Sequence, residues 1–131
     1  MEVQYLDLVD FLLIAQAVLK TPAEDLARLE RIGLAESALA APAGGLGDQD
    51  AYPEFEMKVA VLGFHLVKNH PLPDGNKRAA FLSMIEFAER NDREWNRAPG
   101  DPEETDRVIR ALAASELSVE DFRDWVAERI A

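Results

Sequence analysis

The chain has 131 residues, no cysteine and a formal net charge of −11. This length predicts a single domain, residues 1–131, built around one core. The lack of cysteine excludes disulfides, thiolate nucleophiles and zinc–thiolate sites. The negative charge argues against direct nucleic-acid binding, which needs a cationic surface. Residues 1–10 contain no basic segment and no apolar run is long enough to cross a membrane, so we expect a cytoplasmic protein with no membrane partner.

Hydrophobic periodicity predicts about six to seven helices, and no segment sustains the period-two alternation of a strand. In chain order, the expected helices cover residues 5–19, 22–33, 34–40, 53–69, 76–90, 101–112 and 119 to the end. The expected fold class is therefore all-α, a compact helical bundle.

Residues with known capping preferences mark several of these helix ends. Thr21 is the expected N-cap of the second helix, with Pro22 at its first helical position. Asp101 begins a similar pattern, and Ser118 opens a segment that resembles a capping box. Gly33 is expected to end the second helix. Between the fifth and sixth helices, residues 93–98 form a short polar connection in which Trp95 is expected to be a packing anchor.

The segment from Asn69 to Arg78 combines an imidazole, a carboxylate, an amide and two cations between two apolar runs. Both runs, residues 55–67 and 79–88, are apolar on more than one helical face, which predicts buried helices. Pro71 and Pro73 disfavour helix in the residues before them. A polar turn between two core helices is costly unless it binds a ligand.

The start of the second of these helices has the chemistry of an anion site. Gly75 permits a positive φ, so that the helix can begin at Asn76 with its free N–H groups facing the turn. Lys77 and Arg78 in the first turn oppose the helix dipole, which favours a bound anion such as phosphate. Asn76 would donate to a phosphate oxygen, or cap the helix in the absence of a ligand.

Each remaining polar residue has a chemical and a structural interpretation. His70 could act as a general base near neutral pH, or simply cap the preceding helix. Asp74 could bind Mg²⁺ beside nucleotide phosphates, or be an ordinary turn residue before Gly. Lys68 could reach the same anion site, although an ordinary surface lysine is the simpler interpretation. His65 lies five positions before His70, which is not the spacing of a helical metal pair, so we interpret it as structural.

The sequence from His70 to Arg78 resembles the active-site motif of the Fic/Doc superfamily, His-x-Phe-x-(Asp/Glu)-Gly-Asn-(Gly/Lys)-Arg. Two residues favour the Doc branch: nucleotide-transferring Fic enzymes have Gly at the position of Lys77 and Arg at that of Phe81. Leu72 departs from the family's Phe and would be a smaller apolar anchor for the loop. The resemblance implies a Fic/Doc-type bundle with its active-site loop between two central helices.

The resemblance also implies roles for the site residues. His70 would deprotonate the hydroxyl of a target protein, and Asp74 would hold Mg²⁺ while ATP is the phosphate donor. The implied phosphate-binding residues are Gly75, Asn76, Lys77 and Arg78. Lys68 and Leu72 would be accessory. In the family, the region of the glycine-rich loop 43–48 borders the substrate side, so this loop could be a flap, although a plain linker with at most Leu46 in the core is the favoured interpretation.

By the same resemblance, the expected function is that of a toxin in a type II (Phd/Doc-like) toxin–antitoxin module. It would move the γ-phosphate of ATP to a threonine of elongation factor Tu and so stop translation. The chain lacks the self-inhibitory pattern (Ser/Thr)-x-x-x-Glu-(Gly/Asn), so a Phd-like antitoxin would inhibit it in trans. Two alternatives remain open: a Fic-type nucleotidyltransferase that carries out AMPylation, and a catalytically weak module that binds an antitoxin.

Overall fold

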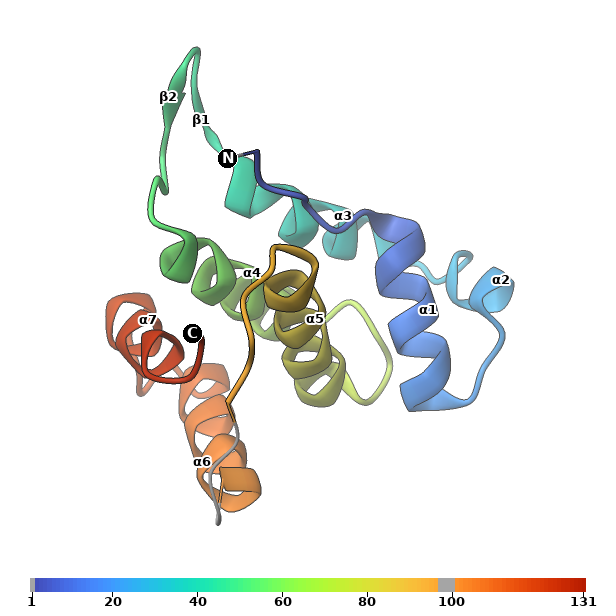
Figure 1. Ribbon diagram of the computed structural model, residues 1–131. Helices are drawn as coiled ribbons and strands as arrows, with labels where there is room; N and C mark the ends of the chain where they lie inside the picture. Colours follow the sequence, from blue (N-terminus) through green and yellow to red (C-terminus); the bar gives the residue numbers. More distant parts are fainter. Residues whose placement is uncertain (1, 97–100) are drawn as a thin grey trace.

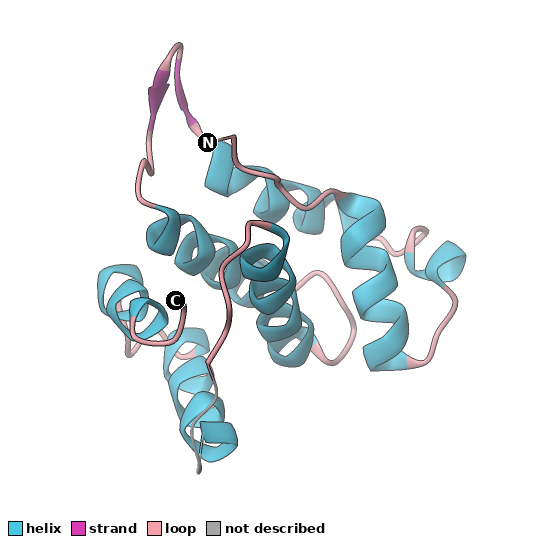
Figure 2. Cartoon of the chain, viewed as in Figure 1, coloured by secondary structure: helices cyan, strands magenta, loops and turns pink. Residues whose placement is uncertain are grey.

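The computed structural model describes residues 2–96 and 101–131, which form helices and one small hairpin (Figures 1 and 2). The elements are α1 (Leu8–Leu19), α2 (Ala23–Leu26), α3 (Ile32–Ala40), the 3-10 helix η1 (Ala41–Ala43), β1 (Gly45–Leu46), β2 (Gln49–Asp50), α4 (Phe55–Asn69), α5 (Asn76–Arg90), α6 (Asp101–Ala113) and α7 (Val119–Ala127). The predicted all-α bundle is confirmed. None of the described helices is both long and apolar enough to cross a membrane.

Helix α4 lies at the centre and packs against α3, α5, α6 and α7. Its buried residues are Lys58, Val59, Ala60, Val61, Leu62, Gly63, Leu66 and Val67. At Gly63, an added Cβ would lie 2.4 Å from the sulfur of Met84 on α5. Glycine at this position therefore allows α5 to approach α4 closely, and dense packing of this kind transmits even small changes in side-chain volume. The two helices that flank the motif are thus closely packed.

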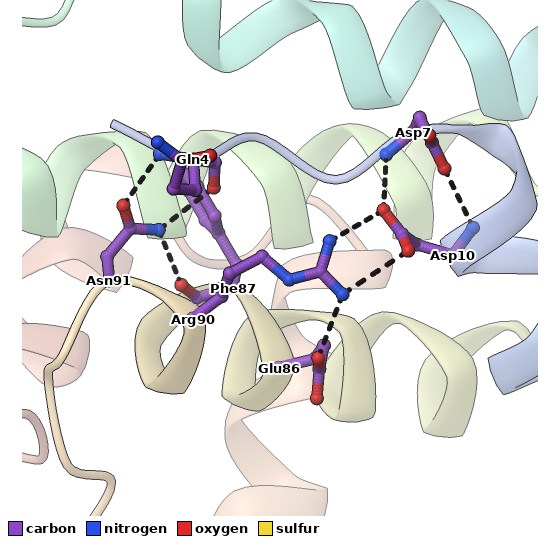
Figure 3. A network of polar contacts seen from close by, with 7 residues as sticks. All are labelled: Gln4, Asp7, Asp10, Glu86, Phe87, Arg90 and Asn91. Atoms are coloured by element: carbon purple, nitrogen blue, oxygen red, sulfur yellow. Dashed lines mark hydrogen bonds and ion pairs between the residues drawn. The ribbon is translucent and has the colours of Figure 1, made fainter. Parts of the chain in front are cut away.

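Helix α1 lies antiparallel to α5 and is fastened to it at both ends. Near the end of α5, Arg90 donates to both carboxylate oxygens of Asp10, at 2.7 and 3.2 Å (Figure 3). The amide of Asn91 is buried and exchanges hydrogen bonds of 2.7 and 2.9 Å with the backbone of Gln4 (Figure 3). At the other end, Val18 lies against Gly75, directly before α5 begins. The N-terminal helix therefore supports both ends of the helix that carries the motif.

The boundaries of α5 and the end of α4 agree with the predicted ones, while α4 begins at Phe55, two residues later than expected; several other boundaries differ more. The predicted second helix ends at Leu26, and α3 already begins at Ile32 and contains Gly33. An added Cβ at Gly33 would meet nothing within 4 Å, so the packing around this position does not require glycine. Thr21 is not an N-cap, because its hydroxyl donates to the carbonyl of Leu19; the free N–H of Ala23 is instead bound by the side chain of Gln16.

The C-terminal part also differs in detail from the predicted pattern. Ser118 caps α7 as expected, since its hydroxyl accepts from the N–H of Asp121 at 3.1 Å. That helix ends at Ala127 and does not continue to the terminus, because Ile130 forms a β-bridge with Trp95. Trp95 is buried, as an anchor should be. The predicted connection 93–98 is described as far as residue 96, and its remainder lies outside the described residues.

The glycine-rich segment is part of a β-hairpin, so the favoured interpretation of a plain linker was wrong. Gly45 pairs with Asp50, and Leu46, which is 86% exposed, contributes nothing to the core. The buried ammonium of Lys58 holds both ends of the hairpin, because it donates to the carbonyl of Pro42 at 3.1 Å and to Asp50 at 2.6 Å. Burial by itself lowers the pKa of Lys58, but the hydrogen bond that it donates to Asp50 and the nearby Tyr5 raise the pKa above its ordinary value.

Replacing this lysine should release the hairpin. In Lys58→Met, the carbonyl of Pro42 and the carboxylate of Asp50 lose their common donor, and a buried group without a partner is unfavourable. We expect the amides of residues 45–50 to exchange with deuterium at least about tenfold faster, which corresponds to about 1.4 kcal/mol. Lys20→Met, which alters a solvent-exposed lysine, is the control. Unchanged exchange in the Lys58 variant would show that the strands alone hold the hairpin.

Candidate functional site

The loop from His70 to Gly75 joins α4 to α5 and has an unusual backbone conformation at both ends. His70 has φ 50° and ψ 56°, and Gly75 has φ 72° and ψ 15°. Both are in the left-handed region, which glycine adopts readily and histidine does not. Between them, Leu72 is only 1% exposed and is part of the core. Leucine at this position is therefore buried deeply enough to hold the loop down.

Asn76 fastens the loop from the other side. Its side chain is 6% exposed, donates to the carbonyl of Leu72 at 2.8 Å and accepts from the N–H of Leu72 at 2.9 Å. These two bonds satisfy both backbone groups of one residue, as a strand partner would. The expectation that Asn76 caps the helix is wrong, because it is the first residue of α5 and Gly75 occupies the capping position. Sequence reasoning missed these two hydrogen bonds because they involve the backbone of Leu72, whose apolar side chain does not indicate a polar contact.

The N-terminus of α5 is open. No side chain caps it, and within the described chain the N–H groups of residues 76–78 have no hydrogen-bond acceptor. They border a cavity of about 650 Å³ between the motif and α6. The motif side of this cavity is lined by Asp74, Gly75, Asn76, Lys77, Arg78 and Phe81. The α6 side is lined by Asp101, Pro102, Thr105, Asp106, Ile109 and Arg110. An uncapped helix N-terminus facing a cavity is a ready anion site.

Lys77 and Arg78 add positive charge to this site. Both side chains are exposed, and neither has an ion-pair partner among the residues that the structure describes. This is notable in a chain with 25 acidic and 14 basic residues, where carboxylates are abundant. Two cations at a helix N-terminus also oppose the helix dipole. An anion bound between the two side chains would give them a partner of opposite charge and would also offset their unfavourable interaction with the helix dipole.

Asp74 is exposed at the edge of the same cavity. One carboxylate oxygen accepts from the N–H of Gly75 at 2.8 Å. Among the described residues, no group of three His, Cys, Asp or Glu side chains could form a metal site. A single carboxylate suits Mg²⁺, which commonly takes one or two protein carboxylates together with substrate phosphates.

The opposite wall of the cavity was not apparent from the sequence. On the motif side, Phe81 lines the cavity and packs edge-on against Trp95, with ring centroids 5.5 Å apart. From α6 come Ile109 and Thr105, whose hydroxyl is buried and has no hydrogen-bond partner in the described part of the chain. Among the charged residues of this wall, Asp106 is paired with Arg110 and Asp101 with Arg129. A cavity with two cations at the helix start and apolar surface from Phe81 and Ile109 suits a phosphorylated ligand with an aromatic or apolar part.

Three of the predicted site residues do not line this cavity. His70 is exposed at the end of α4, and Leu72 lies beneath the loop. Lys68 reaches the far end of α6, where its ammonium donates to the carbonyl of Ala113 at 3.3 Å and to the hydroxyl of Ser115. The structure thus gathers Asp74 through Arg78 at the cavity, places His70 on the same loop and turns Lys68 towards α6.

One contact of His70 was missed by sequence reasoning. Its backbone carbonyl accepts a hydrogen bond of 3.1 Å from the guanidinium of Arg31, which is 39 positions earlier in the chain. The other histidine, His65, is half-buried and lies edge-on to Phe64, with ring centroids 5.3 Å apart. Burial lowers the pKa of His65, which favours its neutral form. These contacts agree with a structural role for His65.

Comparison with known proteins identifies the family. The profile described as the Fic/DOC family matches residues 5–88, which includes the motif and all the elements that support its loop. Toxin Doc of Mycolicibacterium smegmatis (strain ATCC 700084 / mc(2)155) is 42% identical over 55 residues, a match that spans 42% of this chain and 42% of that protein. No solved structure matches the chain. The loop geometry, the open helix N-terminus and the family match lead to one conclusion: the chain belongs to the Fic/DOC family.

Proposed function

We propose that the chain is the toxin of a type II toxin–antitoxin module and that it transfers the γ-phosphate of ATP to a hydroxyl of a target protein. The observation that carries the proposal is the combination of His70 on the loop with two cations at the open N-terminus of α5 that have no ion-pair partner among the described residues. The similarity to a protein named Toxin Doc supports the toxin class. Elongation factor Tu is the proposed target, through the resemblance of the motif to the Doc branch.

In the proposed reaction the loop supplies the general base, and the start of α5 binds the phosphates. His70 accepts the proton of the target hydroxyl while the hydroxyl oxygen attacks the γ-phosphorus. The new oxygen–phosphorus bond forms as the bond from that phosphorus to the bridging oxygen breaks, and ADP leaves with the bonding electrons. Lys77, Arg78 and the free N–H groups of α5 balance the negative charge of the phosphates. His70 then returns its proton to water.

The cavity between the motif and α6 is a suitable place for the nucleotide. Its volume of about 650 Å³ falls within the range of small-molecule sites. Phe81 and Ile109 supply apolar surface to the cavity. Asp74 would hold Mg²⁺, which when bound offsets phosphate charge.

Lys77 is the basis for proposing phosphoryl rather than nucleotidyl transfer. An ammonium beside the helix N-terminus fills part of the space that a second phosphate would take and supplies its own positive charge. The nucleotide would then present its γ-phosphate to the hydroxyl. Phe81, an apolar residue on the cavity wall, supplies no second cation that would hold the α-phosphate for transfer.

Isotope position is the direct test of this proposal. With ATP labelled on either phosphate, we expect purified protein to transfer γ-label, and not α-label, to purified elongation factor Tu or to a protein in bacterial lysate. Lys77→Gly should shift part of the transfer to α-label, because it reopens the second phosphate position. Transfer of α-label by the unaltered protein, with pyrophosphate released, would replace the proposal with AMPylation. If neither label is transferred, the chain is a binding module.

The role of Asp74 has its own test. In Asp74→Asn the side chain keeps its size but loses the charge that attracts Mg²⁺. We expect the affinity for Mg²⁺–ATP to fall about tenfold or more, an effect of about 1.4 kcal/mol, while the affinity for metal-free ATP changes little. Calorimetric titrations with and without Mg²⁺ measure both. Equal losses in the two titrations would remove Asp74 from the metal site.

The proposed partner is a Phd-like antitoxin that inhibits the protein in trans. Expression of the chain alone in a bacterium should arrest growth, and co-expression of the antitoxin should restore it. The chain provides an exposed apolar strip on α1, where Val9 and Leu13, one helical turn apart, are 63% and 54% exposed. An amphipathic helix of the antitoxin would bury such a strip.

A further inference from the structure

His70 has a backbone conformation that needs support. It is the first residue after α4, with φ 50° and ψ 56°, and its N–H donates to the carbonyl of Leu66 at 3.3 Å. Residues with a Cβ adopt this left-handed conformation rarely, and they keep it where the surrounding structure holds them. Lys20, Asp92 and Ser115 also have a positive φ. Within the described chain, His70 is the one of these four whose carbonyl is bound by a distant side chain.

Arg31 supplies that support. Its Nε donates to the carbonyl of His70 at 3.1 Å, and its Nη2 donates to the carbonyl of Asn69 at 2.8 Å. The last carbonyls of a helix have no partner within the helix and carry the negative end of its dipole, so a guanidinium satisfies both needs at once. The planar fork of arginine holds two acceptors in fixed relative positions, which a lysine ammonium cannot do.

A third bond makes the connection reciprocal. The side-chain amide of Asn69 donates to the carbonyl of Leu34 on α3, at 3.0 Å. The end of α4 and the start of α3 thus hold each other through two side chains, that of Asn69 at the end of α4 and that of Arg31 directly before α3. On the far side of His70, Leu72 is held in the core and bound by Asn76. His70 itself is exposed, on a backbone that is held from both sides.

We propose that Arg31 is a positioning residue for His70: it fixes the backbone of His70 so that the imidazole faces the target hydroxyl in the orientation that proton transfer requires. Arg31 itself touches neither nucleotide nor target. The proposal rests on the proposed function, because it assumes that His70 is the base. Misplacement of a catalytic group by about 1 Å can lower a rate about 100-fold, so loss of this support at His70 should have a measurable effect on kcat.

The experiment compares Arg31→Met with Arg28→Met. Arg28 is an exposed arginine three positions earlier whose side chain makes no polar contact in the described part of the chain. We expect Arg31→Met to lower kcat for γ-phosphate transfer to elongation factor Tu by about 10- to 100-fold. The KM for the target and the Kd for ATP should change by less than about twofold, because the cavity is unaltered. Arg31→Lys should recover part of kcat, since one ammonium can still bind a carbonyl.

A second measurement does not depend on activity. The chain has two histidines, so the imidazole NMR signals of His65 and His70 can be assigned with one His65→Gln variant. Arg31→Met should shift or broaden the signal of His70 and leave that of His65 unchanged. Arg28→Met should change neither signal.

The outcomes separate this inference from the proposed function. If His70→Ala is inactive but Arg31→Met keeps full kcat and an unchanged His70 signal, the positioning role is wrong and the proposed function stands. If Arg31→Met disturbs both histidine signals and lowers the melting temperature while kcat per folded molecule is unchanged, Arg31 is only structural and the inference is overturned. If His70→Ala is as active as the parent, the base assignment fails, and the positioning role fails with it.

Discussion

His70→Ala is expected to lower the rate of phosphate transfer to elongation factor Tu by about 10²- to 10⁴-fold, which is the usual contribution of a general base. The physical reason is that no other side chain in the loop accepts a proton near neutral pH. Because the imidazole is exposed, its removal leaves no cavity, and the melting temperature should change little. Expression of the variant without an antitoxin should no longer arrest growth.

His65→Ala is the matched control for this prediction. His65 is the second histidine of the chain, half-buried on α4 against Phe64. Its replacement should reduce stability modestly and leave the rate per folded molecule unchanged. ATP binding, measured by calorimetry, should survive in both variants because neither histidine lines the cavity. A His70→Ala protein that arrests growth as strongly as its parent would show that His70 is not the base.

The sequence predicted best those features that depend only on residues close together in the chain. The bounds of α5 and the end of α4 were predicted because each helix is a long apolar run with a helix-breaking segment at one end. The open start of α5 beside two cations was predicted for the same reason, since a Gly followed by a helix start with two cations is a local pattern; its role as an anion site stays a prediction. The hairpin was missed because its strands are two residues long, too short to show alternation.

The supports of the loop could not be predicted, because each joins residues that are far apart or that show no pattern. Arg31 reaches a carbonyl 39 positions away, and any arginine looks the same in a sequence. The α6 wall of the cavity lies more than 20 positions after the motif, and its helix showed only an ordinary apolar face. The second helix was predicted too long because Gly33 was interpreted as a stop, whereas packing of Ala35, Ala38 and Leu39 keeps it within α3.

The same distinction between local pattern and tertiary contact explains the effect that we expect at Gly75. At Gly75, φ is 72°, and an added Cβ would lie 2.8 Å from Cγ1 of Val18 and 3.3 Å from Cδ2 of Leu19. The left-handed backbone of a residue with a Cβ costs about 1–2 kcal/mol. Contact with the stiff, branched side chain of Val18 adds about 1–3 kcal/mol. Gly75→Ala should therefore lower the free energy of unfolding by about 2–5 kcal/mol, the sum of these two ranges.

Displacement of the loop in Gly75→Ala should lower the activity more than it lowers the stability. A shift at Gly75 moves the N–H groups of α5 relative to His70, so the rate of transfer should fall about 100-fold even where the protein remains folded. Gly33→Ala is the control, because it adds the same methyl group where nothing lies within 4 Å and φ is not positive. Within α3 this change should raise stability by about 0.5–1 kcal/mol and leave activity unchanged. Thermal unfolding and γ-label transfer measure both variants, and a Gly75→Ala protein as stable and active as the Gly33→Ala protein would show that α1 does not set the position of the loop.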